Sequence, residues 1–126
     1  MSYVLLDTDL VVAIHDLVLN PGELPGLALN KSLEGALARV DNRLAFGMVR
    51  DVFDLAALYA MAIAQGHCYN DANKRTAFRA LHVVLELNGV ALPEADPDDL
   101  GDQIIALAQG LIDDGTLADW LRDLVG

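Results

Sequence analysis

The sequence predicts an all-α fold, a compact bundle of about six helices that forms one domain over residues 1–126. Hydrophobic residues make up 54% of the 126-residue chain, which is enough to bury one substantial core. Apolar stretches of helical pattern alternate with short polar or Gly/Pro-containing segments, and no repeat, linker or low-complexity segment divides them. Together these two observations favour a single helical domain.

Residues that commonly begin or end a helix bound each expected element. The expected helix starts are Thr8 or Asp7, Ser32, Asp71 or Asn73, Pro97 in a first turn, and Thr116 with Asp119 as a capping box. The expected ends are Pro21, Gly66 as a C-terminal cap, and Asn88-Gly89. The helices then cover residues 9–18, 32–43 (or to 48), 51–65, 73–87, 97–109 and 116–125. A Gly/Pro loop is expected at residues 20–30, and an extended segment or short strand at residues 90–92.

Composition limits the classes of function. The net charge is −11, which argues against nucleic acid and anionic membrane as partners. No apolar run is as long as a membrane span, and the N-terminus lacks a secretory signal pattern. The single cysteine, Cys68, excludes an internal disulfide and is typical of a cytoplasmic protein. The chain is therefore expected in the cytoplasm.

One polar segment, residues 67–77 (HCYNDANKRTA), lies between two apolar helices and carries the candidate site. Burying polar groups between core helices costs free energy, so such a segment needs a function. The helix that follows leaves unpaired backbone N–H groups at its positive end, which attract anions and phosphate above all. Lys74 and Arg75 add two positive charges there, and cations at a helix N-terminus cost stability unless an anion is bound. An anionic ligand is therefore expected at this end.

Two other side chains of the segment complete a candidate phosphoryl- or nucleotidyl-transfer site. Asp71 lies beside the cations and can hold Mg²⁺, which usually binds through one or two carboxylates together with substrate phosphates. His67 lies four residues upstream, and histidine can accept a hydroxyl proton near neutral pH. The alternatives are structural, with Asp71 only a helix cap and His67 a loop residue that bonds backbone.

This segment resembles the signature of the Fic/Doc family, in particular of its Doc (death on curing) toxins, whose pattern is H-x-F-x-D-x-N-K-R-T-A. Every fixed position matches except Tyr69, which stands where the family has Phe and adds a hydroxyl that needs a partner when buried. The resemblance extends over most of the chain through residues 14–16, 24–26, 32–37 and 88–90. A Fic/Doc-type fold is thereby implied.

The resemblance implies a role for each matched residue. His67 would be the general base, and Asp71 would hold Mg²⁺. Asn73 and Arg75 would hold the phosphates of ATP. Lys74 would turn the nucleotide so that its γ-phosphate faces the acceptor, which makes Lys74 and Arg75 part of the catalytic set with His67.

The resemblance also separates two chemistries. AMP-transferring Fic proteins have Gly at the position of Lys74 and a second Arg at that of Phe78, whereas Arg79 comes one residue late, about 100° around the helix. The implied function is a toxin kinase that moves the ATP γ-phosphate to a Thr or Ser of translation elongation factor Tu and arrests protein synthesis. The alternatives are AMP transfer to a protein hydroxyl and a non-catalytic module that binds an antitoxin and tunes repression of their operon.

Doc toxins also resemble one another in being neutralised by a small antitoxin, whose disordered C-terminal segment folds onto the toxin. An apolar groove for an amphipathic helix is therefore implied, with no residues assigned to it. Four further residues are interpreted as structural or surface residues, namely His15, His82, Cys68 and Thr76.

Overall fold

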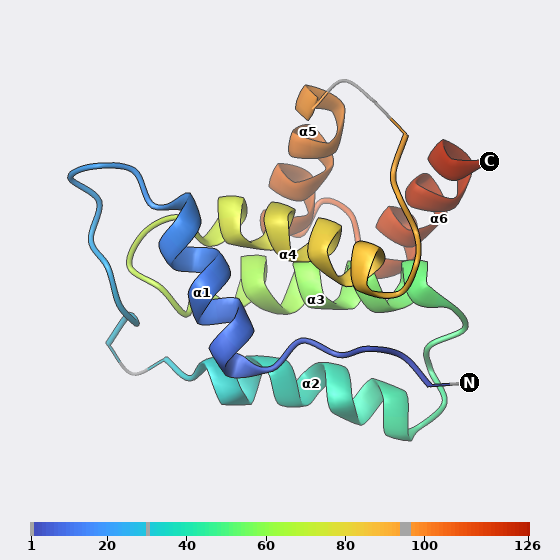
Figure 1. Cartoon of the computed structure of the whole chain (residues 1–126), viewed down its shortest axis with the longest axis horizontal. Helices are drawn as coiled ribbons and strands as arrows, with labels where there is room; N and C mark the ends of the chain where they lie inside the picture. Colours follow the sequence, from blue (N-terminus) through green and yellow to red (C-terminus); the bar gives the residue numbers. More distant parts are fainter. Residues whose placement is uncertain (1, 30, 94–96) are drawn as a thin grey trace.

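The computed structural model describes residues 2–29, 31–93 and 97–126 of the chain. Over these residues it is an all-α bundle (Figure 1), which confirms the predicted fold class. The helices are α1 (Thr8–Val18), α2 (Leu33–Ala45), α3 (Val52–Gly66), α4 (Asn73–Leu87), α5 (Pro97–Ala108) and α6 (Asp114–Val125). None of these helices is both long and apolar enough to cross a membrane.

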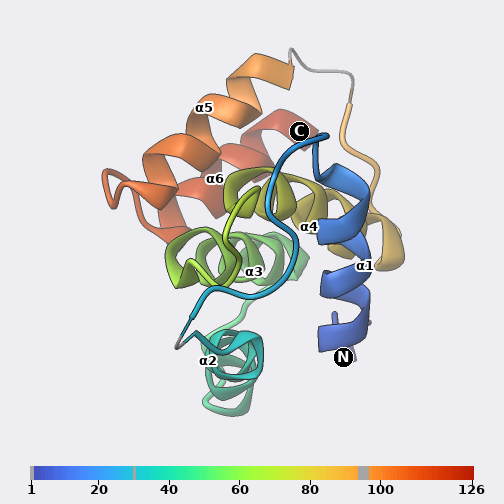
Figure 2. The same ribbon diagram turned by 90° about the vertical axis from the view of Figure 1, so that its left-hand side faces the viewer.

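Helix α3 is the centre of the bundle. Helices α2, α4, α5 and α6 all pack against it. Helix α1 crosses α4 and also contacts α2 (Figures 1 and 2). Ten of the fifteen residues of α3 are buried, so this helix is covered on nearly every face. Alanines such as Ala60 in α3 and Ala77 in α4 are fully buried, and their small side chains let neighbouring helices approach closely.

Short polar side chains begin α1 and α2 at the predicted residues. Asp7 accepts a hydrogen bond from the Leu10 N–H at 2.8 Å at the start of α1, and Ser32 accepts one from the Gly35 N–H at 3.0 Å at the start of α2. Asp51 does the same for α3.

The start of the last helix differs from the prediction. It begins at Asp114 rather than at Thr116, because Asp113 caps it and accepts a hydrogen bond from the Thr116 N–H at 2.8 Å. Thr116 is therefore a donor in the first turn and not the capping residue. An Asp caps a helix at least as well as a Thr, which explains why the earlier residue takes the position.

The predicted cap at the end of the third helix was also wrong. Gly66 is the last residue of α3, and His67 adopts the left-handed conformation that the prediction gave to glycine, with φ 48°. A Cβ added to Gly66 would lie 3.1 Å from the Cys68 Sγ and 3.4 Å from the Ala36 Cβ, so glycine allows the close approach of α2. Of the two alternatives predicted for residues 90–92, the short strand is excluded, because no described segment pairs with them.

Candidate active site

The chain turns sharply between α3 and α4, in the loop of residues 67–72. Both ends of this loop are non-glycine residues with positive φ, His67 at 48° and Ala72 at 67°. Such conformations cost free energy and persist where the surrounding structure holds them, often at functional sites. The turn returns the chain onto α3 and brings His67 to the first turn of α4.

A cavity of about 400 Å³ lies at this turn and contains every site residue that the sequence predicts. It is lined by Glu23, Ala64, His67, Asn70, Asp71, Ala72, Asn73, Lys74, Arg75 and Ala108. The structure therefore brings His67, Asp71, Lys74 and Arg75 together at the N-terminal end of α4. Glu23 was not predicted, because 52 residues separate it from Arg75 and nothing in the sequence pattern connects the two.

The N-terminus of α4 has no side-chain cap. Its N-cap residue is Ala72, so the prediction that Asp71 or Asn73 caps this helix was wrong. No side-chain oxygen therefore occupies the first-turn N–H groups, which remain available to a ligand in the cavity. The helix dipole adds positive potential at the same end. Lys74 is exposed and makes no ion pair with any described residue, so its charge is available to a ligand.

Asn73 uses its side-chain amide to hold the loop. Its Oδ1 accepts a hydrogen bond from the Tyr69 N–H at 3.1 Å, and its Nδ2 donates to the Tyr69 carbonyl at 2.8 Å. An amide that bonds both backbone groups of one residue replaces a strand partner for that residue. Asn73 thus keeps the loop closed over the start of α4, next to the cavity that it lines.

Asp71 is held by two other parts of the chain. Its Oδ2 accepts a hydrogen bond from the Leu24 N–H at 2.8 Å, and its backbone oxygen lies 2.9 Å from Nε2 of His15. The other carboxylate oxygen, Oδ1, receives no hydrogen bond from the described residues. Asp71 can thus supply one oxygen ligand to Mg²⁺, which takes its remaining ligands from phosphates and water.

Arg75 is not free in this structure. Its Nη1 donates to the Val18 carbonyl at 2.5 Å, and its Nη2 donates to the carboxylate of Glu23. The hydrogen bond with Arg75 holds the pKa of Glu23 below its usual range, and the same bond raises the pKa of Arg75. Two of the five guanidinium N–H groups are thereby used, and three remain.

Three of the residues interpreted as structural or surface residues, Cys68, Thr76 and His82, make only local or core contacts. Cys68 is buried, and burial raises the pKa of its thiol, which disfavours the nucleophilic thiolate. Thr76 is buried and donates to the Ala72 carbonyl at 2.7 Å. His82 bonds the Phe78 carbonyl through Nδ1 at 2.9 Å, one turn back in its own helix.

Tyr69, which stands where the Fic/Doc pattern has Phe, is buried in the motif loop. Its ring is 3% exposed and stacks on His15, with centroids 3.6 Å apart. Its hydroxyl has no hydrogen-bond partner among the described residues. Burial raises the pKa of Tyr69 to about 12, so the phenol stays protonated.

Comparison with known proteins agrees with this geometry. The model of the Fic/DOC family matches residues 5–85, which include the motif loop and the first turn of α4. Protein kinase doc of Escherichia phage P1 is 38% identical to this chain over 117 residues, which cover 92% of this chain and 91% of that protein. The motif, the fold and both similarities lead to one conclusion. The chain belongs to the Fic/DOC family.

Proposed function

We propose that this chain is a Doc-type toxin kinase that transfers the γ-phosphate of ATP to a Thr or Ser hydroxyl of translation elongation factor Tu and so arrests protein synthesis. The observation that carries the proposal is the single cavity that unites His67, Asp71 and the uncapped N-terminus of α4 with its two cations. The similar phage protein carries the name Protein kinase doc, which supports transfer of a phosphoryl group.

In such a reaction each residue of the cavity has a distinct role. His67 is exposed beside the helix end and accepts the proton of the target hydroxyl. The hydroxyl oxygen then forms a bond to the γ-phosphorus while the bond to the β–γ bridging oxygen breaks, and ADP leaves. The α4 N–H groups, Lys74 and Arg75 bind the phosphate oxygens, and Asn73 holds the loop that presents them. Bound Mg²⁺, held by Asp71, would neutralise charge on the phosphates.

The first turns of α4 favour this reaction over AMP transfer. Phe78 stands where AMP-transferring relatives would need a second Arg, and its ring packs against His82 with centroids 4.8 Å apart. Arg79 is exposed and does not line the cavity, so it does not supply the missing charge. Lys74 remains the cation that orients the nucleotide.

Label transfer tests the function. Purified protein would be mixed with bacterial elongation factor Tu, Mg²⁺, and ATP labelled at either the α- or the γ-phosphate. We expect label to be transferred only from the γ-position. Transfer should be lost in His67→Ala and in excess EDTA, and it should be retained in the matched control His82→Ala. Label from the α-position would mean AMP transfer, and no transfer from either position would support the non-catalytic module.

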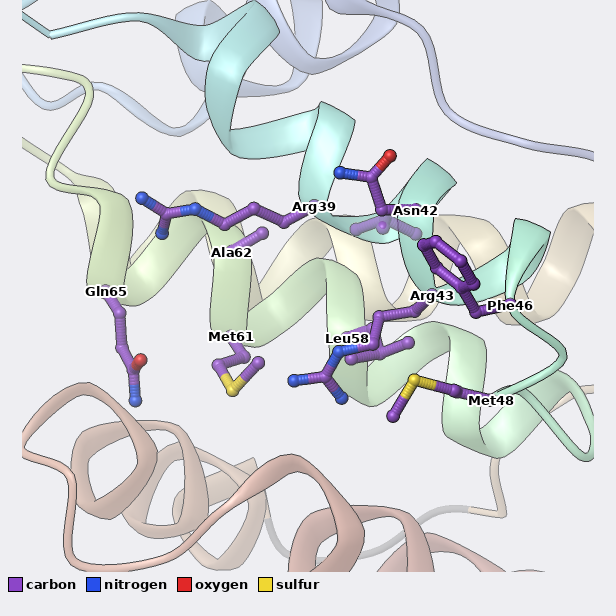
Figure 3. Close-up of a pocket in the computed structure, with 10 residues that line it drawn as sticks. Arg39, Asn42, Arg43, Phe46, Met48, Leu58, Met61, Ala62 and Gln65 are labelled. Carbon is purple, nitrogen blue, oxygen red and sulfur yellow. The ribbon is translucent and has the colours of Figure 1, made fainter.

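We also propose that a small antitoxin neutralises this protein by docking a helix between α2 and α3. An apolar hollow of about 300 Å³ lies there, with Leu58, Met61 and Ala62 of α3 in its lining (Figure 3). Phe46 and Met48 at its edge are 79% and 57% exposed and line the same hollow, so they extend its apolar surface into one contiguous patch.

The charge at this hollow indicates the chemistry of the docked helix. Figure 3 shows the side chains of Arg39 and Arg43 reaching from α2 along the hollow. Arg39 makes no ion pair with a described residue, and Arg43 makes only a 3.7 Å pair with Asp114. In a chain of net charge −11 these two cations favour an amphipathic helix with acidic residues on its edges.

Growth rescue tests the docking site. The toxin would be expressed together with the small protein encoded beside it. We expect Phe46→Ser to remain toxic and to escape neutralisation, whereas Leu17→Ser, which changes an equally exposed apolar residue on α1, is still neutralised. Neutralisation of both variants alike would contradict this site.

A further inference from the structure

Helix α1 reaches the motif loop through one buried side chain. His15 has 0% exposure, and its ring stacks on Tyr69 with 7° between the ring planes. Its Nε2 lies 2.9 Å from the backbone oxygen of Asp71, a residue 56 positions later in the chain. A carbonyl oxygen only accepts hydrogen bonds, so Nε2 carries the proton and donates it. His15 therefore joins α1 to the candidate metal ligand.

Two hydrogen bonds hold Asp71 from opposite ends of the residue. The first goes from His15 to the backbone oxygen, and the second goes from the Leu24 N–H to the carboxylate Oδ2. Both donors come from the N-terminal part of the chain, whereas Asp71 belongs to the loop before α4. With the backbone and one carboxylate oxygen held, the remaining oxygen keeps a single orientation at the cavity that Asp71 lines.

We propose that His15 is a positioning residue for Asp71. Its N–H sets the orientation of the Asp71 carboxylate and thereby the affinity of the site for Mg²⁺. The effect on Mg²⁺ rests on the proposed function, in which Asp71 is the metal ligand. Hydrogen-bond partners of metal ligands commonly change metal affinity by about 10–100-fold, although they never touch the ion.

Two substitutions distinguish the contribution of the His15 N–H from that of its ring. His15→Phe keeps a flat ring that can stack on Tyr69 but loses the donor. His15→Gln loses the ring but keeps an N–H donor at a similar distance from the backbone. A residue that only fills space would tolerate Phe better than Gln, whereas a positioning donor would tolerate Gln better than Phe.

The first measurement is direct binding of Mn²⁺, as a probe for Mg²⁺, to the full chain with a non-hydrolysable ATP analogue, followed by electron paramagnetic resonance. We expect His15→Phe to weaken Mn²⁺ binding roughly tenfold and His15→Gln to bind nearly as the wild type does. Unchanged binding in His15→Phe, or equal losses in both variants, would overturn the proposal. If His15→Phe does not fold, Mn²⁺ binding by His15→Gln alone tests the proposal. Weak binding by this folded variant, which keeps an N–H donor, would contradict a role for the donor.

The second measurement needs no metal. The Leu24 amide bonds the Asp71 carboxylate, so its hydrogen exchange should quicken in His15→Phe and not in His15→Gln. The Leu10 amide, which Asp7 caps in α1, is the internal control and should not change. If the wild type binds no Mn²⁺, the role of Asp71 as a metal ligand fails, and the Leu24 exchange still decides whether His15 positions Asp71. Slow Leu24 exchange in His15→Phe would overturn that role.

Discussion

The guanidinium of Arg75 donates a hydrogen bond to the carboxylate of Glu23, which lies in the loop between α1 and α2. The carboxylate is fixed further by the Asn20 N–H, which donates to Oε1 at 2.6 Å. An anion at the end of α4 would meet a cation that already has a negatively charged partner. A phosphate bound at this end would therefore compete with Glu23 for Arg75.

Removing the negative charge of Glu23 should strengthen nucleotide binding. We expect Glu23→Gln to bind a non-hydrolysable ATP analogue roughly fivefold more tightly, which is the scale of one exposed ion pair. The hydrogen bond from Arg75 keeps the pKa of Glu23 low, so the competition should persist throughout the neutral range. Isothermal titration calorimetry measures the change.

Glu86→Gln is the matched control, because it removes one negative charge from an exposed position in α4 outside the cavity. It should leave the dissociation constant unchanged. Weaker binding by Glu23→Gln would mean that Glu23 supports Arg75 rather than competes for it.

Lys74 should decide which phosphate is transferred. Lys74→Gly removes the exposed cation at the start of α4 and leaves His67 and Asp71 in place. We expect γ-phosphate transfer to elongation factor Tu to fall at least about tenfold, since a positioned cation on a phosphate is worth at least this much. Appearance of α-label on the target would agree with the same account, and unchanged γ-transfer would refute it.

The unpaired hydroxyl of Tyr69 should lower stability. Because the buried hydroxyl has no partner among the described residues, Tyr69→Phe should raise the free energy of unfolding by about 1 kcal/mol. Urea denaturation gives the difference, and activity should not change because the ring and its stack on His15 remain.

Tyr59→Phe is the matched control with the opposite sign. The Tyr59 hydroxyl accepts from the Leu6 N–H at 3.1 Å and donates to the Leu6 carbonyl at 3.4 Å. Its removal should lower the free energy of unfolding by about 1 kcal/mol. A loss of stability in both variants would mean that the Tyr69 hydroxyl also has a partner in solution.

Arg122 of α6 should stabilise the start of α3. It donates to Asp51 at 2.8 and 2.9 Å and to Asp54 at 2.5 Å. We expect Arg122→Met to lower the free energy of unfolding by about 1–2 kcal/mol, because two partly buried carboxylates lose a charged partner. Arg50 bonds Asp54 from a much more exposed position, so Arg50→Met should lower the free energy of unfolding clearly less than Arg122→Met does.

The same network predicts a pH dependence. The hydrogen bond from Arg122 lowers the pKa of Asp51. Burial would raise the pKa of Asp54, but hydrogen bonds from Arg50 and Arg122 outweigh it and hold that pKa below its usual range. A carboxyl group with a lower pKa in the folded state adds stability above its unfolded pKa of about 3.9 and loses it as the pH falls further. Urea midpoints between pH 5 and pH 2 should therefore fall more steeply in the wild type than in Arg122→Met.

Much of the fold was predictable because its signals are local. The all-α class, the caps at Asp7 and Ser32 and the helix after the motif all follow from side chains within a few residues of each other. One error was also local, because Asp113 rather than Thr116 caps α6, whereas the errors at the motif loop lie where distant segments meet. Gly66 leaves room for Cys68 and for Ala36 of α2 rather than forming a left-handed turn, and Asp71, which the sequence offered as a cap of α4, accepts a hydrogen bond from Leu24 instead.

The sequence by itself determined which chemical groups the site contains, since His67, Asp71 and the two cations lie within nine residues and any turn between two packed helices brings them together. Only the tertiary structure decided what holds those groups. His15, Glu23 and Leu24 come from the N-terminal part of the chain, and they reach the site because α1 packs across α4. Local patterns carry no information about such partners, because packing of distant helices alone sets which side chains meet.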